Sequence, residues 1–373
     1  MRIGLDAFAA IGTSGNSTYS REMIRSLIAD GVGHEWYAFE YVHDLLRSNT
    51  PLSSGAYHNR YVRLSPSYFP LPGLPVINEM VLRTAARLSR IDVMHFTAPL
   101  SIQQGSFKRV VTIHDLAVYY DPSWVKVGPG QEFKDKAALM MSSDAIIAVS
   151  ESTKRDILKR FSVPPEKISV IYEGASEEFY PDNDEVAIES IVGSGRYVLC
   201  VGQLQPRKNN IALVRACGVV FKTQKDLKLV FAGRAVSDAY IRDLWTEIKN
   251  AGIESKVVIR HDLTNEQLRK LYTRAECLIY PSLFEGFGLP ILESLKCGSP
   301  VITSNNSSLP EVAGGAGLLV DPYSVDSIVD ALHQLLTDTE LRKMLCTRIP
   351  EQLSKFSWQK AARETINVYE SLS

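Results

Sequence analysis

The chain has 373 residues, 45% of them hydrophobic, and its 41 basic side chains balance 42 acidic ones to a formal net charge of -1. This length predicts about two domains, each large enough to bury an apolar core. Nucleic-acid-binding proteins usually carry a marked basic excess, so the balanced charge argues against that class. Apolar clusters run throughout the chain and exclude an intrinsically disordered protein.

The five cysteines are widely spaced, and none forms a C-x-x-C pair. This pattern predicts neither a disulfide framework nor a zinc site, so we expect buried thiols in a reducing cytoplasm. Asp6 interrupts the opening apolar run, which argues against a signal peptide. No stretch approaches the ~18 apolar residues of a membrane-spanning helix. We therefore expect a cytoplasmic protein, and we expect any membrane association to be peripheral, at the inner face of the cytoplasmic membrane.

Short apolar runs alternate with amphipathic helical patterns in the first half of the chain, which is typical of doubly wound α/β domains. The strand Arg2–Ala7 precedes a small polar loop, Gly12–Ser17, and a helix that ends near Gly31. One face of this helix is apolar, with Tyr19, Met23, Leu27 and Ile28. Further strands are expected at Tyr37–Tyr41, Tyr61–Leu64, Val93–Phe96, Val110–Ile113, Ala145–Val149 and Ile168–Ile171, and helices over residues 78–89, 131–142 and 151–161.

The same alternation begins again in the second half. Strands are expected at Tyr197–Val201, Leu227–Ala232, Val257–Arg260, Cys277–Tyr280, Val301–Ser304 and Gly317–Val320. Between the two series, the polar segment Glu177–Gly195 predicts a linker. We therefore predict α/β domains over residues 1–180 and 181–355. We also predict a C-terminal helix over residues 356–373 that packs back on the first domain. It needs an apolar partner because it carries a stripe of apolar residues at helical spacing, namely Phe356, Trp358, Ala362, Ile366 and Tyr369.

The segment Pro281–Glu293 carries the strongest chemical signal. It follows the strand Cys277–Tyr280 and leads into a short helix with Pro290 in its first turn. Its glycines allow backbone amides to approach a ligand beside a helix N-terminus, where anionic oxygens and hydroxyls bind. Glu285 lies in the loop, and Glu293 lies one turn into the helix. Without further context, the alternative to a functional role is that Glu285 is a solvated side chain and that Glu293 only stabilises the dipole at the start of its helix.

With the rest of the chain, this segment resembles the retaining glycosyltransferases of family 4. That family has an E-x7-E motif and the GT-B fold, an α/β architecture with two facing Rossmann-like domains. The other segments that resemble it in order and spacing are Val201–Asn209, His114–Leu116, Val149–Ser152, Tyr172–Gly174, Leu309–Val312, Val320–Pro322 and Phe356–Trp358. The resemblance covers nearly the whole chain and implies the GT-B fold class for it.

The resemblance also implies a site for a nucleoside diphosphate sugar in the second domain. Arg207 and Lys208 would neutralise the diphosphate leaving group, so neither a metal nor another cofactor is expected. Glu285 would be catalytic beside the donor sugar, and Glu293 would accept hydrogen bonds from ribose hydroxyls. Backbone amides would hold sugar or phosphate oxygens at Gly286, Phe287, Gly288 and Leu289.

In the first domain, His114 follows the strand Val110–Ile113. The resemblance implies that it is a second catalytic residue, which contacts the transferred sugar or polarises the reacting centre. Asp115 either orients this histidine or caps the following loop. Ser150 is a candidate phosphate contact, with a helix N-cap as the equal alternative.

The first polar loop departs from the family pattern. Gly15 and Asn16 retain candidate donor-binding positions, but Ser17 and Thr18 replace the second glycine and the arginine of the family's loop. The replacements indicate an altered donor or acceptor preference.

Residues 46–114 have a local basic surplus, with Arg47, Arg60, Arg63, Arg83, Arg87, Arg90, Lys108 and Arg109 against Glu79 and Asp92. The same region contains the apolar, proline-rich run Tyr68–Pro75. Basic and apolar residues together suit an anionic membrane surface or a polyprenyl-diphosphate acceptor. An ordinary basic face beside a loop is the equal alternative.

We therefore expect a glycosyltransferase that moves a hexose from a nucleoside diphosphate sugar to a saccharide with retained configuration. The segments that carry the family resemblance look most like those of bacterial O-antigen and exopolysaccharide mannosyltransferases. This favours GDP-mannose as the donor and a lipid-linked saccharide as the acceptor. The alternatives are a GT-B nucleotide-sugar epimerase, which lacks the Glu-Gly-Phe-Gly-Leu-Pro arrangement, and a non-catalytic nucleotide-sugar-binding subunit. Intact Arg207, Lys208, Glu285 and Glu293 argue against the second alternative.

Overall fold

The computed structural model describes residues 1–7, 10, 14–31, 33–39, 61–64, 84, 86–98, 106–124, 137–138 and 140–373, with the backbone alone at 61–64 and 185–187. The chain divides into two compact units. Unit 1 comprises Met1–Gly174 and Ser357–Ser373, and unit 2 comprises Ala175–Phe356. The first boundary therefore falls between Gly174 and Ala175, shortly before the boundary expected near residue 180.

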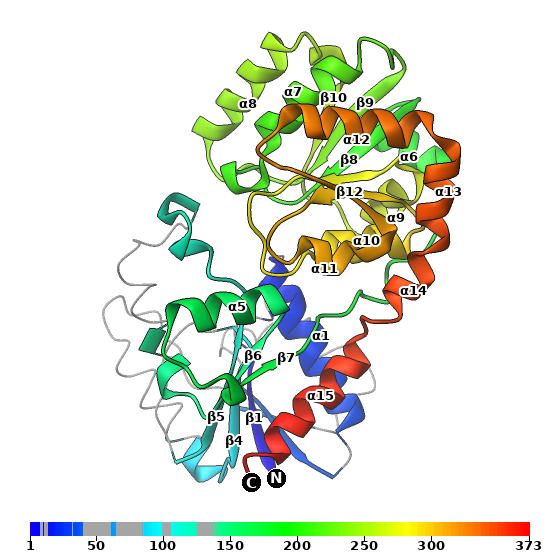
Figure 1. Ribbon diagram of the computed structural model, residues 1–373. Coiled ribbons are helices and arrows are strands. Elements are labelled where there is room, and N and C mark those ends of the chain that lie inside the picture. Colours follow the sequence, from blue (N-terminus) through cyan, green and yellow to red (C-terminus); the bar gives the residue numbers. More distant parts are fainter. Residues whose placement is uncertain are drawn as a thin grey trace. The chain divides into compact units, whose positions relative to one another are not determined.

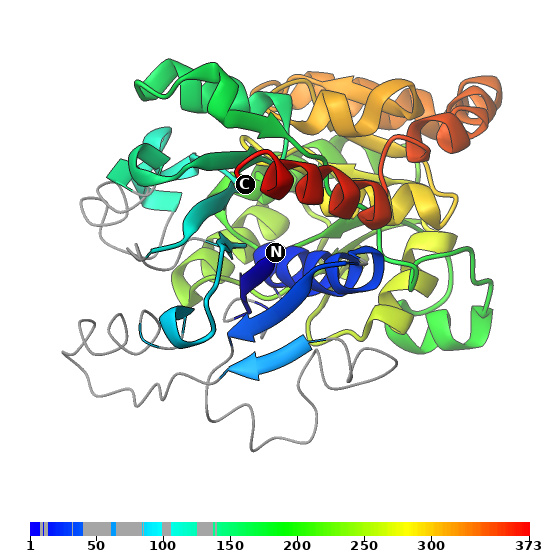
Figure 2. The ribbon, with the colours of Figure 1, turned by 90° about the horizontal axis from the view of Figure 1, so that it is seen from below.

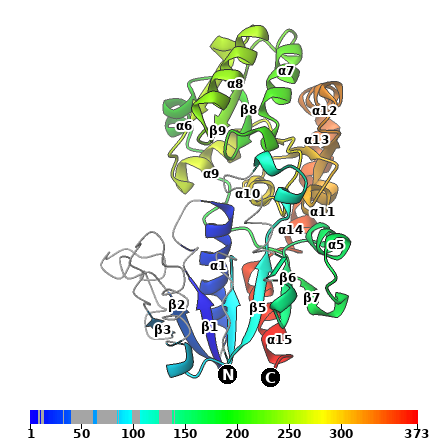
Figure 3. The ribbon, with the colours of Figure 1, turned by 90° about the vertical axis from the view of Figure 1, so that its left-hand side faces the viewer.

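The described part of unit 1 is built on a parallel sheet of seven strands in the order β3-β2-β1-β4-β5-β6-β7. Figure 3 shows β3 at one edge of this sheet and β7 at the other. The strands are β1 (Arg2–Asp6), β2 (Glu35–Phe39), β3 (Tyr61–Leu64), β4 (Val93–Phe96), β5 (Lys108–Ile113), β6 (Ala145–Ala148) and β7 (Ile168–Val170). Each overlaps a strand predicted from the sequence, which confirms the α/β class of this half.

Helices α1 (Gly15–Asp30), α5 (Glu151–Arg160) and α15 (Trp358–Glu370) belong to unit 1, and α15 lies beside α1 (Figures 1 and 2). The contact is close, because the rings of Tyr19 and Trp358 are 5.7 Å apart between centroids and Thr365 Oγ1 lies 3.9 Å from Met23 Sδ. The prediction that the C-terminal helix returns to the first domain is thus confirmed. Phe356 was wrongly included in its stripe, since this ring packs on Phe287 in unit 2 at 5.8 Å.

Unit 2 is built on a parallel sheet of six strands in the order β10-β9-β8-β11-β12-β13. The strands are β8 (Arg196–Val201), β9 (Leu227–Ala232), β10 (Val257–Arg260), β11 (Leu278–Tyr280), β12 (Val301–Ser304) and β13 (Gly317–Val320). The helices are α6 (Glu185–Val192), α7 (Asn210–Val220), α8 (Asp238–Asn250), α9 (Asn265–Arg274), α10 (Leu289–Lys296), α11 (Leu309–Ala313), α12 (Val325–Thr337), α13 (Thr339–Thr347) and α14 (Ile349–Leu353). In its apolar core, residues of the strands pack against helices α7, α8 and α12.

Two local predictions are wrong. The segment Glu177–Gly195 is not a linker throughout, because Ile188, Ile191 and Val192 are buried in α6. Gly15, Asn16 and Ser17 are not loop residues, because α1 begins at Gly15. Ser14 sets this start by accepting a hydrogen bond from Ser17 N at 3.2 Å, as an N-cap does.

The order of the second sheet decides where its loops meet. All strands are parallel, so their carboxyl ends lie at one edge, where ligand-binding loops of open α/β sheets gather. β11 is paired with both β8 and β12. The three loops that follow these strands therefore run side by side. Among the described residues, no helix is both long enough and apolar enough to cross a membrane.

Candidate functional site

The loop between β11 and α10, Pro281–Gly288, is held by its neighbours at nearly every step. Leu283 N donates a 2.8 Å hydrogen bond to Arg207 O, in the loop after β8. From the loop after β12, Asn306 Nδ2 donates to Leu283 O at 2.9 Å. Ser304 Oγ, at the end of β12, donates to Ser282 O at 2.7 Å. The backbone that carries Glu285 is thus fixed before any ligand binds.

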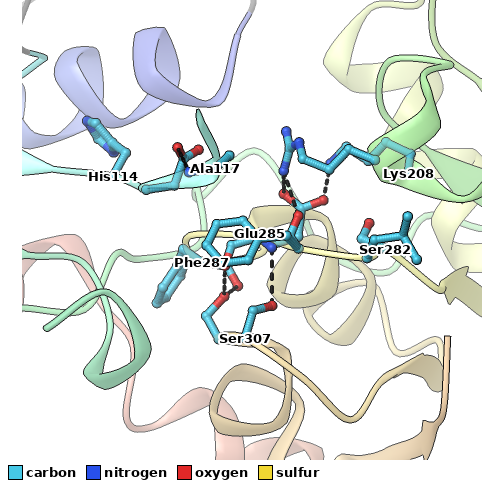
Figure 4. Close-up of polar contacts among 12 residues, drawn as sticks. His114, Ala117, Lys208, Ser282, Glu285, Phe287 and Ser307 are labelled. Atoms are coloured by element: carbon cyan, nitrogen blue, oxygen red, sulfur yellow. Dashed lines mark hydrogen bonds and ion pairs between the residues drawn. The ribbon is translucent and has the colours of Figure 1, made fainter. Parts of the chain in front are cut away.

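Two serines complete this support, and the sequence analysis missed both. Glu285 N donates to Ser307 Oγ at 3.1 Å, as Figure 4 shows. Ser308 Oγ, which is fully buried, lies 3.0 Å from Glu285 O and 2.7 Å from Phe287 O, to which it donates. The signal was available, because Asn305–Ser308 is a polar run directly after a buried strand.

Arg207, Lys208 and Glu285 form a compact charged triad at the same edge. Figure 4 shows Lys208 beside Glu285. Arg207 Nη1 lies 2.8 Å from Glu285 Oε2, and Lys208 Nζ lies 2.6 Å from Glu285 Oε1. The exposed fractions of the three side chains are 16%, 11% and 9%. Arg207 Nη1 also donates to Phe284 O at 2.7 Å. Two cations against one carboxylate leave the triad with a net positive charge.

The electrostatics keep Glu285 ionised. Burial alone would raise the pKa of this carboxyl, but Arg207 and Lys208 outweigh it and lower the pKa to about 2. Burial lowers the pKa of Lys208, and Glu285 opposes that shift. Lys208 Nζ also lies over the ring of Tyr280, 4.5 Å from its centroid, and donates to the Tyr280 hydroxyl. The sequence analysis placed Tyr280 at the end of a strand and did not assign it to the site.

The loop after β8 is a tight turn that is held to the neighbouring loops. Gly202 has φ +119°, and a Cβ on Gly233 would lie 1.9 Å from Gly202 O, so the β8 and β9 loops approach each other closely. Asn209 has φ +57° and donates through Nδ2 to Pro281 O at 3.2 Å and to Pro322 O at 2.7 Å. The basic pair is therefore presented on a short, tied-down turn.

The helix that follows Glu285 starts as expected. Gly288 has φ +123°, Pro290 occupies the first turn of α10, and Ile291, Leu292 and Leu295 are buried. A side chain at Gly288 would be strained by this φ and would lie 3.1 Å from Leu309. The start of α10 therefore lies where the sequence predicted it, while the contact of Gly286–Leu289 with a donor stays a prediction.

Glu293 lies apart from the triad, in α10. Its Oε2 accepts a 2.7 Å hydrogen bond from the hydroxyl of Tyr272 in α9, a partner that the sequence analysis did not find. Burial raises the pKa of Glu293 to about 7, and the Tyr272 hydrogen bond only partly opposes this shift. A carboxyl with such a pKa exists in both protonation states near neutrality. This is unusual for a purely structural side chain and more frequent at functional sites.

His114 lies in unit 1 after β5 and is buried. Its Nε2 donates to Thr97 O at 2.8 Å, and its Nδ1 lies 3.5 Å from Glu173 Oε1. Of the two roles expected for Asp115, the structure shows a loop cap, because its Oδ1 accepts from Ala117 N at 3.0 Å. Both ring nitrogens of His114 are therefore engaged inside the unit.

The other candidates of unit 1 lie at helix starts. Ser150 is fully buried and accepts from Thr153 N at 3.0 Å, so it serves as the N-cap of α5, the second of the two roles expected for it. Gly15 and Asn16 are exposed in the first turn of α1, where backbone N–H groups favour anions. Their contact with a donor stays a prediction.

Most of the basic, apolar segment at residues 46–114 lies outside the described residues, including Tyr68–Pro75. The described Lys108 is 3.4 Å from Asp144, and Asp92 accepts from Arg2 N at 2.8 Å. The expected membrane or acceptor surface therefore stays a prediction.

Comparison with known proteins identifies the site's family. The model of glycosyl transferases group 1 matches residues 182–352, and that of glycosyltransferase family 4 matches residues 13–179. The chain is similar to the O-antigen chain mannosyltransferase B of Escherichia coli, with 31% identity over 71% of each chain. It is also 27% identical to the serotype-specific mannosyltransferase WbdA of Escherichia coli, over 74% of this chain and 35% of that one. It thus spans only about a third of WbdA.

Solved structures agree with this fold. That of Anabaena Alr3699/HepE in complex with UDP-glucose aligns over 100% of both chains with a TM-score of 0.75 and 16% identity. The matched models, the E. coli relative and the loops of unit 2 all lead to one conclusion. The chain belongs to glycosyltransferase family 4, with a C-terminal domain of the glycosyl transferase group 1 type.

Proposed function

We propose that this glycosyltransferase moves a mannosyl unit from GDP-mannose to a saccharide acceptor with retained anomeric configuration. The observation that carries the proposal is the net positive Arg207–Lys208–Glu285 triad on a pre-ordered loop. A nucleoside diphosphate becomes a better leaving group when fixed cations neutralise its developing charge. Two cations that are largely shielded from water act more strongly on a bound phosphate than exposed ones would.

Glu285 has a part in this arrangement that differs from that of the cations. Its carboxylate accepts a hydrogen bond from each of the two cations, which keeps both in place next to the loop. A bound diphosphate supplies a second anion, so the carboxylate becomes available to the donor sugar, where positive charge develops in the transition state. The diphosphate would also oppose the effect of burial and favour the charged form of Lys208.

The remaining contacts follow from the family resemblance. Glu293 would accept hydrogen bonds from the ribose, the amides of Gly286–Leu289 would hold sugar or phosphate oxygens, and His114 would lie by the transferred sugar. The mannosyl unit is supported by the names of the two E. coli mannosyltransferases. GDP as its carrier is supported by the motif resemblance alone. The name of the first relative supports an O-antigen or related surface polysaccharide as the product. A polyprenyl-diphosphate-linked acceptor is supported by the basic and apolar residues of segment 46–114 in the sequence.

The test is transfer itself. Purified protein is incubated with GDP-mannose and a synthetic lipid-linked mannoside, with UDP-glucose as the competing donor, and the new glycosidic bond is assigned by NMR. We expect an α-mannoside from GDP-mannose. A β-linked product would refute retention, and product from UDP-glucose alone would refute the donor. Conversion of the donor to an epimer without acceptor would replace transfer by epimerisation, and binding without turnover would indicate a nucleotide-sugar-binding subunit.

A further inference from the structure

Glu173 is a buried carboxyl side chain to which the proposed function gives no role. It follows β7 in unit 1 and is 4% exposed. Burial raises the pKa of Glu173, and His114 opposes this shift. A carboxyl group removed from water needs a partner, and the partner that the structure places opposite Glu173 Oε1 is Nδ1 of His114, at 3.5 Å.

The fold holds both members of this pair in place. Behind Glu173, the backbone of Gly174 is pressed against the start of α15, since a Cβ there would lie 2.4 Å from Trp358 N. The backbone carbonyl oxygen of His114 itself accepts a hydrogen bond from Thr153 Oγ1 at 3.3 Å. The imidazole meets the ring of Tyr19 edge-on, with 4.7 Å between the centroids.

The hydrogen bonds determine where the protons of the pair lie. Thr97 O can only accept, so Nε2 of His114 carries a proton. Nδ1 then faces Glu173 with a single proton between them. Either Nδ1–H donates to the carboxylate, or the protonated carboxyl donates to Nδ1. The pair is neutral as a whole in both forms, and the ring is bound at both nitrogens.

We propose that Glu173 is a positioning residue that fixes the imidazole of His114 and balances its charge during glycosyl transfer. This inference rests on the proposed function, in which His114 lies by the donor sugar. A neutral, oriented pair suits a transition state that is itself positively charged at the sugar, whereas an isolated imidazolium would oppose it. With both nitrogens engaged, His114 does not act as the proton acceptor of the reaction.

The kinetic test is a double-mutant cycle with a conservative rescue. Glu173→Leu removes the partner of Nδ1, and a displaced ring should lower kcat on the order of 10-fold to 100-fold. The donor KM should change less than about 2-fold, because uniform binding is unaffected. Glu173→Gln keeps an N–H donor for Nδ1 and should restore most of kcat. In a His114→Ala background, Glu173→Leu should have no further effect on kcat.

Asp156→Leu is the matched control. Asp156 is a carboxyl of the same unit, 7% exposed, that accepts from the Tyr120 hydroxyl and does not bond His114. Its effect should be the same with and without His114. All rates are taken per folded molecule. An effect of Glu173→Leu that persists undiminished in the His114→Ala background, or a Glu173→Gln enzyme as slow as Glu173→Leu, would overturn the proposal.

A spectroscopic test separates this inference from the proposed function. In 15N-labelled protein, the ring resonances of His114 are assigned by their absence in His114→Ala. Glu173→Leu should shift Nδ1 of His114 and leave His95, whose ring nitrogens lie 2.5 Å from the Tyr369 hydroxyl and 2.8 Å from Thr112 Oγ1, unchanged. An unshifted His114 would refute the pairing even in an active enzyme. If no donor is turned over, the proposed function fails, and these spectra still decide the role of Glu173.

Discussion

Glu293→Gln should make the protein more stable at alkaline pH while weakening donor binding. The pKa of Glu293 is raised from 4.5 to about 7 by burial. A carboxyl with a raised folded-state pKa binds its proton more tightly in the folded than in the unfolded chain. Its contribution to stability is therefore fully present below pH 4.5 and is lost as the pH rises through 7.

The magnitude follows from the size of the shift. Between 4.5 and about 7 the difference is about 2.5 pH units, which corresponds to about 3.4 kcal/mol at full ionisation. Glu293 is only partly buried, and solvent reduces the value to about 2 kcal/mol. Gln has no charge to desolvate, and its amide oxygen can still accept from Tyr272. The variant should therefore gain about 2 kcal/mol between pH 5 and pH 8.5, or about 4–8 °C in Tm.

Denaturant and thermal unfolding of both proteins at the two pH values measure this gain. Glu247→Gln is the control in the same unit, because a hydrogen bond from Arg215 lowers the pKa of Glu247 and predicts no alkaline gain. Calorimetric titration with GDP should show weaker binding to Glu293→Gln, since a neutral amide accepts ribose hydrogen bonds less strongly than a carboxylate. A stability difference that does not change with pH would refute the account of Glu293 as a desolvated carboxyl.

Three further predictions concern the triad. Arg207→Ala and Lys208→Ala should each weaken GDP binding by about 1.5–3 kcal/mol; unchanged affinity in both would remove this loop from the diphosphate site. EDTA should leave most of the transfer activity, because Arg207 and Lys208 provide the positive charge; loss of activity that magnesium or manganese restores would contradict this. Glu285→Gln should chiefly lower kcat rather than raise the donor KM, and an undiminished kcat per folded molecule would exclude this carboxylate from catalysis.

The sheets and the charged loops could be predicted because their signals are local. A buried parallel strand is a short continuous apolar run, so β9, β10, β12 and β13 have the ends that the sequence predicted. The motif around Glu285 is likewise contiguous. Local signals were misleading where polar residues predicted a loop or a linker but a helix cap or buried apolar residues produced a helix. Ser14 draws Gly15 into α1, and Ile188 and Ile191 turn part of an apparent linker into α6.

The partners of the site residues could not be predicted, because each comes from another element of the fold. Tyr272 reaches Glu293 from α9, and Glu173 meets His114 from two strands away in the sheet. Which polar groups face each other is decided by the pairing of strands. A single sequence does not contain that pairing as a pattern.

Ser308 offers the sharpest test of such an unpredicted partner. Its fully buried hydroxyl donates to Glu285 O and Phe287 O, and Ser308→Ala removes the donor that both carbonyls share. The loss should destabilise unit 2 by about 1–3 kcal/mol and loosen the backbone that orients Glu285. Ser299→Ala is the control, because this buried hydroxyl donates to Ala275 O at 3.1 Å, outside the loop. Both variants should unfold more readily, but kcat per folded molecule should fall, on the order of 10-fold, in Ser308→Ala alone, since small displacements of a reacting group are amplified in the rate. Equal kcat in the two variants would show that Ser308 supports the fold without positioning Glu285.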